Sequence, residues 1–164
     1  MNFCGIIYIN NLTAYLDMEK KIVAKIFAEH GLGKVESVAN IEIGFTNKVY
    51  VVNDAFILKV CEDKSNEQKF EIEVFFYNFF KDKIPVPEIK VFDKSKSIYS
   101  KFFMIYPKIR GDNLYAKWHL LNNDQRKIII KQLCHILKVI NQSPYDEFLQ
   151  KFDVNFSDNW HDKI

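Results

Sequence analysis

The segment IEIGFTNKVYVVNDAFILKV, residues 41–60, decides how this chain folds. β-branched and aromatic residues run through it, and turn-forming residues interrupt them twice, at 44–47 and at Asn53-Asp54. Because Asn and Asp tolerate positive φ, the second interruption predicts a two-residue hairpin. Together with residues 35–40, which have a similar composition, the segment predicts three antiparallel strands.

Lys59 is the unusual residue of this segment, because it interrupts the apolar end of the third predicted strand. Side chains alternate across a strand, so Lys59 shares a face with Ile57. A buried ammonium without a partner would lose its proton, whereas a nearby carboxylate keeps it charged. We expect Glu73, with Glu71 as the second choice, to supply that carboxylate. The alternative is that Lys59 extends from the strand end into solvent and both glutamates are solvated.

Helical periodicity flanks the three strands on both sides. Residues 17–30, DMEKKIVAKIFAEH, predict an amphipathic helix with Asp17 as its N-cap and Gly31 as its stop. Residues 65–81 predict a second helix, capped by Ser65. The apolar stripe expected on this second helix consists of Ile72, Phe75, Phe76 and Phe79.

The remainder of the chain changes from extended to helical near Gly111. Residues 89–93 and 101–109 predict two more strands, after a connection whose two prolines exclude a helix. Helical spacing then dominates residues 113–121 and 123–141. The sequence therefore predicts an α+β fold, in which a five-stranded antiparallel sheet with one packed helix is followed by helices. The expected domains are residues 1–110, including the helix at 17–30, and residues 111–164.

The composition of the 164 residues predicts a soluble protein of the reducing cytoplasm. A net charge of +2, with lysines dispersed among acidic residues, provides no basic surface for nucleic acid. No apolar run approaches the ~20 residues that a membrane-spanning helix needs. The N-terminal residues lack the cationic start and the cleavage site of a signal peptide. Three widely spaced cysteines fit free thiols better than disulfides or a zinc site.

The order of the elements, three strands, one helix and two strands, is the layout with which a protein-kinase-type small lobe holds ATP. In that layout Ile57 would touch the adenine and Lys59 would reach the phosphates. Gly44 would let the turn approach the phosphates closely, and Thr46 and Asn47 would offer donors to them. The sequence contains neither GxGxxG nor GxxxxGK[ST], so it indicates neither a Rossmann nor a Walker site.

Five motifs in this order resemble the N-terminal part of the aminoglycoside phosphotransferase and choline-kinase-like family. They are G44-F-T-N47-K-V-Y50, I57-L-K59, E73, I84-P-V-P87 and F102-F-M-I-Y-P-K-I-R-G111-D-N-L114. The resemblance covers about residues 35–142. It implies a protein-kinase-like small lobe followed by the first helices of a helical large lobe.

The resemblance also implies a role for each residue of a nucleotide site. Lys59 would contact the α- and β-phosphates of ATP or GTP, and Glu73 would orient it. The residues that would wall the adenine are Ile43, Val49 and Ile57. Mg²⁺ would accompany the nucleotide.

The hinge after the last strand is the part of the resemblance that would read the base. Tyr106 falls at the family's gatekeeper position, and the alternative is an aromatic residue that packs in a core at a strand end. Adenine would be read by the Pro107 carbonyl and the Ile109 amide, or by a register shifted by one residue. Pro107 has no N–H, so only the acceptor role is open to it.

The family's chemistry depends on a downstream HGDxxxxN-type loop and a later Asp that binds magnesium, and neither motif occurs in the 164 residues. The His-Asp pair at 161–162 is followed by only two residues. We therefore expect no catalytic residue and no metal ligand in this chain, and little or no phosphoryl transfer. A truncated large lobe explains this pattern. Its exposed helix faces would need cover from the tail at 145–164 or from a second copy of the chain in a homodimer.

Three functions follow from these features. The leading one is the ATP-binding lobe of a phosphotransferase that transfers a γ-phosphate to a hydroxyl of an aminoglycoside, a choline-like molecule, a sugar or a similar polar acceptor. Antibiotic resistance is one phenotype of that chemistry. The second is a non-catalytic nucleotide-binding or interaction module with a kinase-like small lobe. The third is an unrelated α+β binding domain that does not respond to nucleotide.

Overall fold

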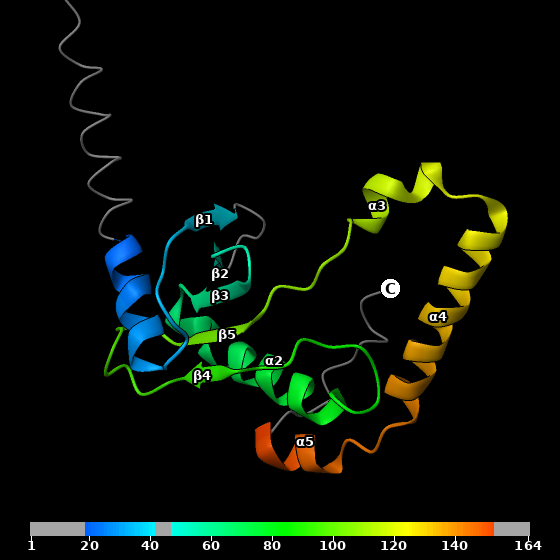
Figure 1. Cartoon of the computed structure of the whole chain (residues 1–164). Coiled ribbons are helices and arrows are strands. Elements are labelled where there is room, and N and C mark those ends of the chain that lie inside the picture. Colours follow the sequence, from blue (N-terminus) through cyan, green and yellow to red (C-terminus); the bar gives the residue numbers. More distant parts are fainter. Residues whose placement is uncertain (1–18, 42–46, 153–164) are drawn as a thin grey trace, which may run out of the picture. The chain divides into compact units, whose positions relative to one another are not determined.

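The computed structural model describes residues 19–41 and 47–152, which form two compact units (Figure 1). The first unit runs through Lys81 and resumes at Val86–Arg110. The second consists of Asp82–Pro85 and the chain from Gly111 onward. The sheet lies entirely in the first unit, and the described part of the second unit contains helices only.

Five antiparallel strands form one sheet in the order β1-β2-β3-β5-β4. Their bounds are β1 Val38–Ile41, β2 Asn47–Val52, β3 Phe56–Cys61, β4 Val91–Asp93 and β5 Phe103–Pro107. The five-stranded antiparallel sheet predicted from the sequence is therefore confirmed. The last two strands are shorter than the predicted ranges of 89–93 and 101–109.

The turn between β2 and β3 is the predicted two-residue hairpin, with Asn53 and Asp54 at φ values of 55° and 52°. The Asn53 side chain also fixes the chain that precedes β1. Its Oδ1 accepts from the backbone N–H groups of Glu36 and Ser37 at 2.8 and 3.1 Å, and its Nδ2 donates to the Lys34 carbonyl at 2.8 Å. One amide therefore joins the hairpin to the connection that precedes the sheet.

Asn53→Gly is expected to lower the free energy of unfolding by about 1–2 kcal/mol, because it removes these three hydrogen bonds while glycine accepts the positive φ without strain. Asp54→Gly is the matched control, since Asp54 has nearly the same φ and its side chain pairs with Lys108 at an exposed site. We expect it to change stability by less than about 0.5 kcal/mol. Urea denaturation of both variants measures the difference, and equal losses would contradict the role of the Asn53 amide.

The two faces of the sheet are covered by different helices, and side-chain alternation assigns each strand residue to one face. One face packs against the helix at residues 19–29 through Tyr50, Val52, Leu58, Val60, Phe103 and Ile105, together with Val23, Ile26 and Phe27 of that helix. The other packs against α2, Glu67–Phe80, through Cys61, Phe102 and Met104, together with Phe70 and Val74 of α2. The sheet is thus the middle layer of three.

The helix at 19–29 ends where the sequence predicts. Gly31 has a φ of 66°, Leu32 N–H donates to the Phe27 carbonyl at 2.9 Å, and Gly31 N–H donates to the Ala28 carbonyl at 3.2 Å. These two bonds form a Schellman C-cap, for which glycine is the favoured residue. The predicted cap at Asp17 lies outside the described residues.

The start and the buried face of α2 differ from the prediction. Asp63, rather than Ser65, provides the cap, because its carboxylate accepts from the Ser65 N–H at 2.9 Å and opens a 3₁₀ turn at Lys64–Asn66. The predicted stripe of Ile72, Phe75, Phe76 and Phe79 is only half-buried, whereas the buried residues of α2 are Phe70, Val74 and Phe80. The apolar residues of this helix occur on all its sides, so periodicity alone could not identify the face that meets the sheet.

The second unit contains two short helical segments, one long helix and a final short helix. They are α3 Leu114–Lys117, the 3₁₀ turn Trp118–Leu120, α4 Asn123–Gln142 and α5 Asp146–Phe152. The helix predicted at 113–121 is therefore split. A capping box between Asn122 and Gln125 begins α4. α4 buries none of its residues, and its exposed apolar side chains are Ile128, Ile130, Leu133 and Leu137. Among residues 19–41 and 47–152, no helix combines the length and apolarity needed to cross a bilayer.

Candidate functional site

An ion pair between β3 and α2 is the central feature of the first unit. Lys59 Nζ lies 2.5 Å from Glu73 Oε2 and 2.7 Å from Glu73 Oε1, and the two side chains are 17% and 26% exposed. The Lys59 ammonium also lies 5.7 Å from the centre of the Phe70 ring. Glu71, the second choice of the sequence analysis, pairs with Lys94 instead. The lysine therefore does not extend into solvent. Its partner is Glu73 of α2, which supplies the opposite charge that a partly buried ammonium needs.

Tyr77 is the residue of this site that the sequence analysis did not identify. It lies one helical turn beyond Glu73, and its hydroxyl donates to Glu73 Oε1 at 2.8 Å. Its ring meets the Tyr106 ring at a centroid distance of 6.4 Å and an angle of 63°. The i, i+4 spacing from Glu73 was the available signal. Tyr77 and Lys59 both donate to Glu73 Oε1, so the carboxylate is held by two groups.

The strand register places several of the predicted nucleotide-site residues on the α2 face of the sheet. Val49 is opposite Lys59 across β2 and β3, and Ile57 is opposite Tyr106 across β3 and β5. Directly paired residues share a face, and so do residues two apart on one strand. Asn47 lies on this face as well, and its buried Oδ1 has no hydrogen-bond partner among the described residues. The structure therefore brings these five residues together.

The backbone at the end of β5 presents an acceptor at the edge of the sheet. Lys108 N–H donates to the Ala55 carbonyl at 2.8 Å, so Lys108 faces β3. Backbone polar groups alternate in direction along a strand, and the Pro107 carbonyl therefore faces the β4 side. The pairing of β4 with β5 ends at Val91 opposite Ile105, two residues before Pro107. The side chain of Ile109, just beyond the strand, is 66% exposed. This geometry is compatible with the acceptor role expected of Pro107.

Part of the predicted site falls on residues that the structure does not describe. Ile43, Gly44 and Thr46, which would form one adenine wall and the phosphate turn, lie outside the described residues. Within the described ranges, 19–41 and 47–152, no group of three or more His, Cys, Asp and Glu side chains is arranged to hold a metal ion.

One buried and three half-buried tyrosines make the stability of the first unit depend on pH in the alkaline range. Burial, followed by the neighbouring carboxylate, raises the pKa of Tyr77 and of Tyr106 beside Glu73, and of Tyr50 beside Glu19. Burial also raises the pKa of Tyr99. In the unfolded chain a tyrosine titrates near pH ~10. The contribution of these groups is therefore fully present below pH ~10, and it is lost as pH rises above that value, because the unfolded chain releases protons first.

We expect the free energy of unfolding to fall between about pH 10 and 11.5, and Tyr77→Phe to make that fall shallower. The difference should be less than the ~1.4 kcal/mol per pH unit that one fully buried proton would give, since the hydroxyl is partly solvated. Tyr115→Phe is the matched control, because Tyr115 is 93% exposed and should leave the slope unchanged. Urea denaturation at several pH values measures all three slopes.

The sequence matches one protein-family model over most of its length. This model describes a phosphotransferase enzyme family, and residues 37–159 match it. The chain belongs to this phosphotransferase family. No curated relative matches the sequence.

Solved structures of aminoglycoside phosphotransferases have the same fold as this family member. The GDP and kanamycin complex of APH(2")-IIia is 18% identical, with a TM-score of 0.68 over 80% of this chain and 44% of that one. ADP-bound APH(2'')-Ib is 17% identical, with a TM-score of 0.59 over 74% and 40%. The streptomycin-ATP-APH(2")-IIa ternary complex is 18% identical, with a TM-score of 0.54 over 74% and 40%.

These similarities confirm the predicted fold: a kinase-like α+β small lobe followed by helices. At such identities they concern the fold alone. The chain spans less than half the length of each of these three structures.

Proposed function

We propose that this phosphotransferase-family chain supplies the nucleotide-binding lobe of a kinase that phosphorylates a hydroxyl of a polar small molecule. The observation that carries the proposal is the half-buried Lys59–Glu73 pair on the sheet face that also holds Ile57 and Tyr106. A lysine held there by a carboxylate is positioned to meet the phosphates of ATP or GTP, while the apolar side chains beside it suit a base. Domain limits of 1–110 and 111–164 are part of the proposal.

The roles proposed for individual residues are those that the resemblance to the family implies. Lys59 contacts the α- and β-phosphates, Glu73 orients Lys59, and the Pro107 carbonyl accepts from the base. The turn that contains Gly44 covers the phosphates. Mg²⁺ arrives with the nucleotide, and its protein ligands belong to sequence outside these 164 residues. An aminoglycoside is the acceptor we favour, because the neighbours with this fold include complexes named for kanamycin and streptomycin.

Isothermal titration of the 164-residue chain with Mg-ATP and Mg-GTP tests the proposal. We expect saturable binding of at least one nucleotide, together with stabilisation of the first unit by roughly RT ln(1+[L]/Kd). Adenosine and guanosine are the matched controls, and they should bind more weakly because they offer no phosphate to Lys59. Equal affinity for nucleotide and nucleoside would show that Lys59 does not contact the phosphates. If neither nucleotide binds, the proposal is overturned.

A non-catalytic nucleotide-binding module is the second candidate, favoured by the absence of an HGDxxxxN-type loop from the sequence. The two candidates differ in the reading frame beyond codon 164. A continuing frame that encodes such a loop favours the enzyme, and the longer protein should then phosphorylate kanamycin in an assay with radiolabelled ATP or GTP. A stop codon after Ile164, with nucleotide binding but no transfer, favours the module.

A further inference from the structure

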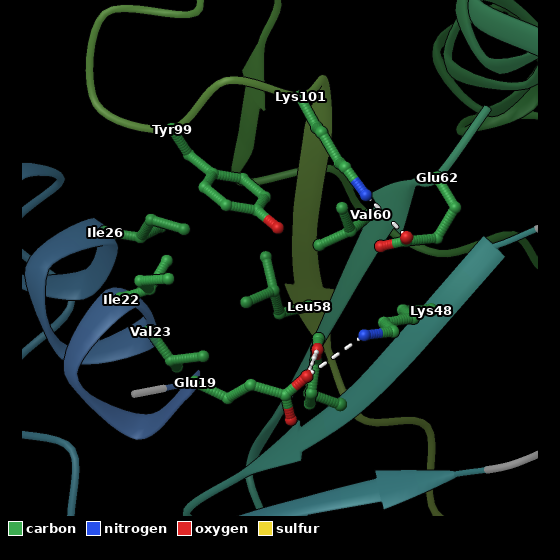
Figure 2. Close-up of a pocket in the computed structure, with 11 residues that line it drawn as sticks. Glu19, Ile22, Val23, Ile26, Lys48, Leu58, Val60, Glu62, Tyr99 and Lys101 are labelled. Atoms are coloured by element: carbon green, nitrogen blue, oxygen red, sulfur yellow. Dashed lines mark hydrogen bonds and ion pairs between the residues drawn. The ribbon is translucent and has the colours of Figure 1, made fainter. Parts of the chain in front are cut away.

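The sheet face opposite Lys59 contains a pocket that the proposed function does not use. The helix at 19–29, strands β2 and β3 and the connection before β5 enclose a space of about 290 Å³ (Figure 2). Its apolar lining residues are Ile22, Val23, Ile26, Leu58 and Val60. Of these, Ile22 is half-buried and the other four are buried in the core. For scale, an apolar cavity of ~150 Å³ holds one benzene molecule. The pocket thus has room for a single ring with a substituent.

The charged groups at the pocket neutralise one another. Lys48 Nζ lies 3.0 Å from Glu19 Oε1, and the Tyr50 hydroxyl donates to the same oxygen at 3.0 Å. Lys101 Nζ lies 2.5 Å from Glu62 Oε2 on the other side of the opening. Each ammonium therefore already has a carboxylate partner. A charged ligand would have to separate one of these pairs, whereas an uncharged ligand would leave both intact.

Tyr99 is a polar residue of this lining that takes no part in either ion pair. Its side chain points from the connection before β5 into the pocket (Figure 2). No described residue hydrogen-bonds to its hydroxyl. A tyrosine hydroxyl keeps its proton at neutral pH and can donate. Burial raises the pKa of Tyr99 further in the same direction. A half-buried donor that no described residue engages, beside apolar side chains, matches a ligand that has one acceptor and an apolar body.

We propose that this pocket binds a small uncharged molecule that combines a ring-sized apolar body with one hydroxyl or carbonyl group. Such a ligand would place its apolar part against the half-buried Ile22 and pair its polar atom with Tyr99. Ligands of roughly ten non-hydrogen atoms give a Kd on the order of 0.1–1 mM in a site of this kind. The pocket is independent of the nucleotide site, because Leu58 and Lys59 point to opposite faces of β3.

Four single-ring probes test the proposal on the full 164-residue chain by saturation-transfer NMR and by methyl chemical shifts. Benzyl alcohol has the proposed chemistry, toluene lacks the hydroxyl, and benzoate and benzylammonium add a charge of either sign. We expect benzyl alcohol to bind tightest and both ions to bind at least about fivefold more weakly. Mg-ATP should not displace benzyl alcohol.

Two variants locate the binding. Ile22→Trp places an indole in the pocket and should abolish binding of benzyl alcohol and toluene, with the methyl spectrum verifying that the chain is folded. Tyr99→Phe keeps the shape and should weaken benzyl alcohol about fivefold while toluene is unaffected. The proposal is overturned if no probe saturates at concentrations on the order of 10 mM, if folded Ile22→Trp still binds, or if Tyr99→Phe weakens both probes equally. None of these results depends on the nucleotide site, so each outcome is separate from the fate of the proposed function.

Discussion

Replacement of Lys59 by alanine is expected to remove most of the stabilisation of the chain by Mg-ATP or Mg-GTP. At a ligand concentration of ~100 Kd the wild-type chain should gain about 2.7 kcal/mol. Truncating one partner of a desolvated charge pair typically costs 2–5 kcal/mol of binding, which corresponds to a loss of about 30-fold or more in affinity. Thermal unfolding with and without nucleotide should therefore show the full shift in the wild type and at most about a third of it in the variant.

Lys48→Ala is the matched control for this experiment. Lys48 also lies on a strand and also pairs with a glutamate, Glu19 at 3.0 Å, but it points to the opposite face of the sheet. The control loses an ion pair of the same kind without touching the proposed phosphate site, so its response to nucleotide should equal that of the wild type. If Lys59→Ala retains the wild-type shift, the phosphates do not bind at Lys59. If both variants lose it, general destabilisation explains the effect.

Phe70→Ala is expected to have the largest effect on stability, a loss of about 3–5 kcal/mol in the free energy of unfolding. Phe70 is 2% exposed, and its ring lies 6.3 Å from that of Phe92 and 5.7 Å from the Lys59 ammonium. It anchors α2 to the sheet, so the truncation leaves a cavity beneath the helix that carries Glu73. The variant should therefore also bind nucleotide less well.

Tyr115→Ala provides the comparison for that loss, because it truncates an aromatic side chain that is 93% exposed. It should change the free energy of unfolding by less than about 0.5 kcal/mol. Urea denaturation followed by the amide cross-peaks of β3 reports on the sheet itself. A loss below about 1 kcal/mol for Phe70→Ala would contradict the packing of α2 described here.

The elements that follow from local chemistry could be predicted from the sequence. The hairpin at Asn53-Asp54 and the end of the first helix at Gly31 require positive φ, which few residues adopt easily, so residue type nearly determines conformation. The capping of α2 was predicted less well. Ser65 and Asp63 are both competent caps, and the choice between them depends on how the chain leaves β3.

Long-range packing decided the features that sequence patterns did not reveal. The apolar residues of α2 surround the helix, so the buried face was set by the sheet rather than by periodicity. The Lys59–Glu73 pair was predictable because desolvation demands a partner for the lysine. The role of Tyr77 was not predictable. Its hydroxyl donates to Glu73, and the packing of α2 against the sheet decides which groups surround that carboxylate.

The order of the strands has a consequence for how this protein behaves at high concentration. The two outermost strands, β1 and β4, contain only four and three residues, whereas the longer β2 and β3 are paired on both sides. Short edge strands offer an incoming strand few free N–H and C=O groups to pair with, which limits fibril-like growth. The exposed leucines and isoleucines of α4 are then the surface through which copies of the chain should adhere, and polar substitutions there should improve solubility more than changes at either border of the sheet.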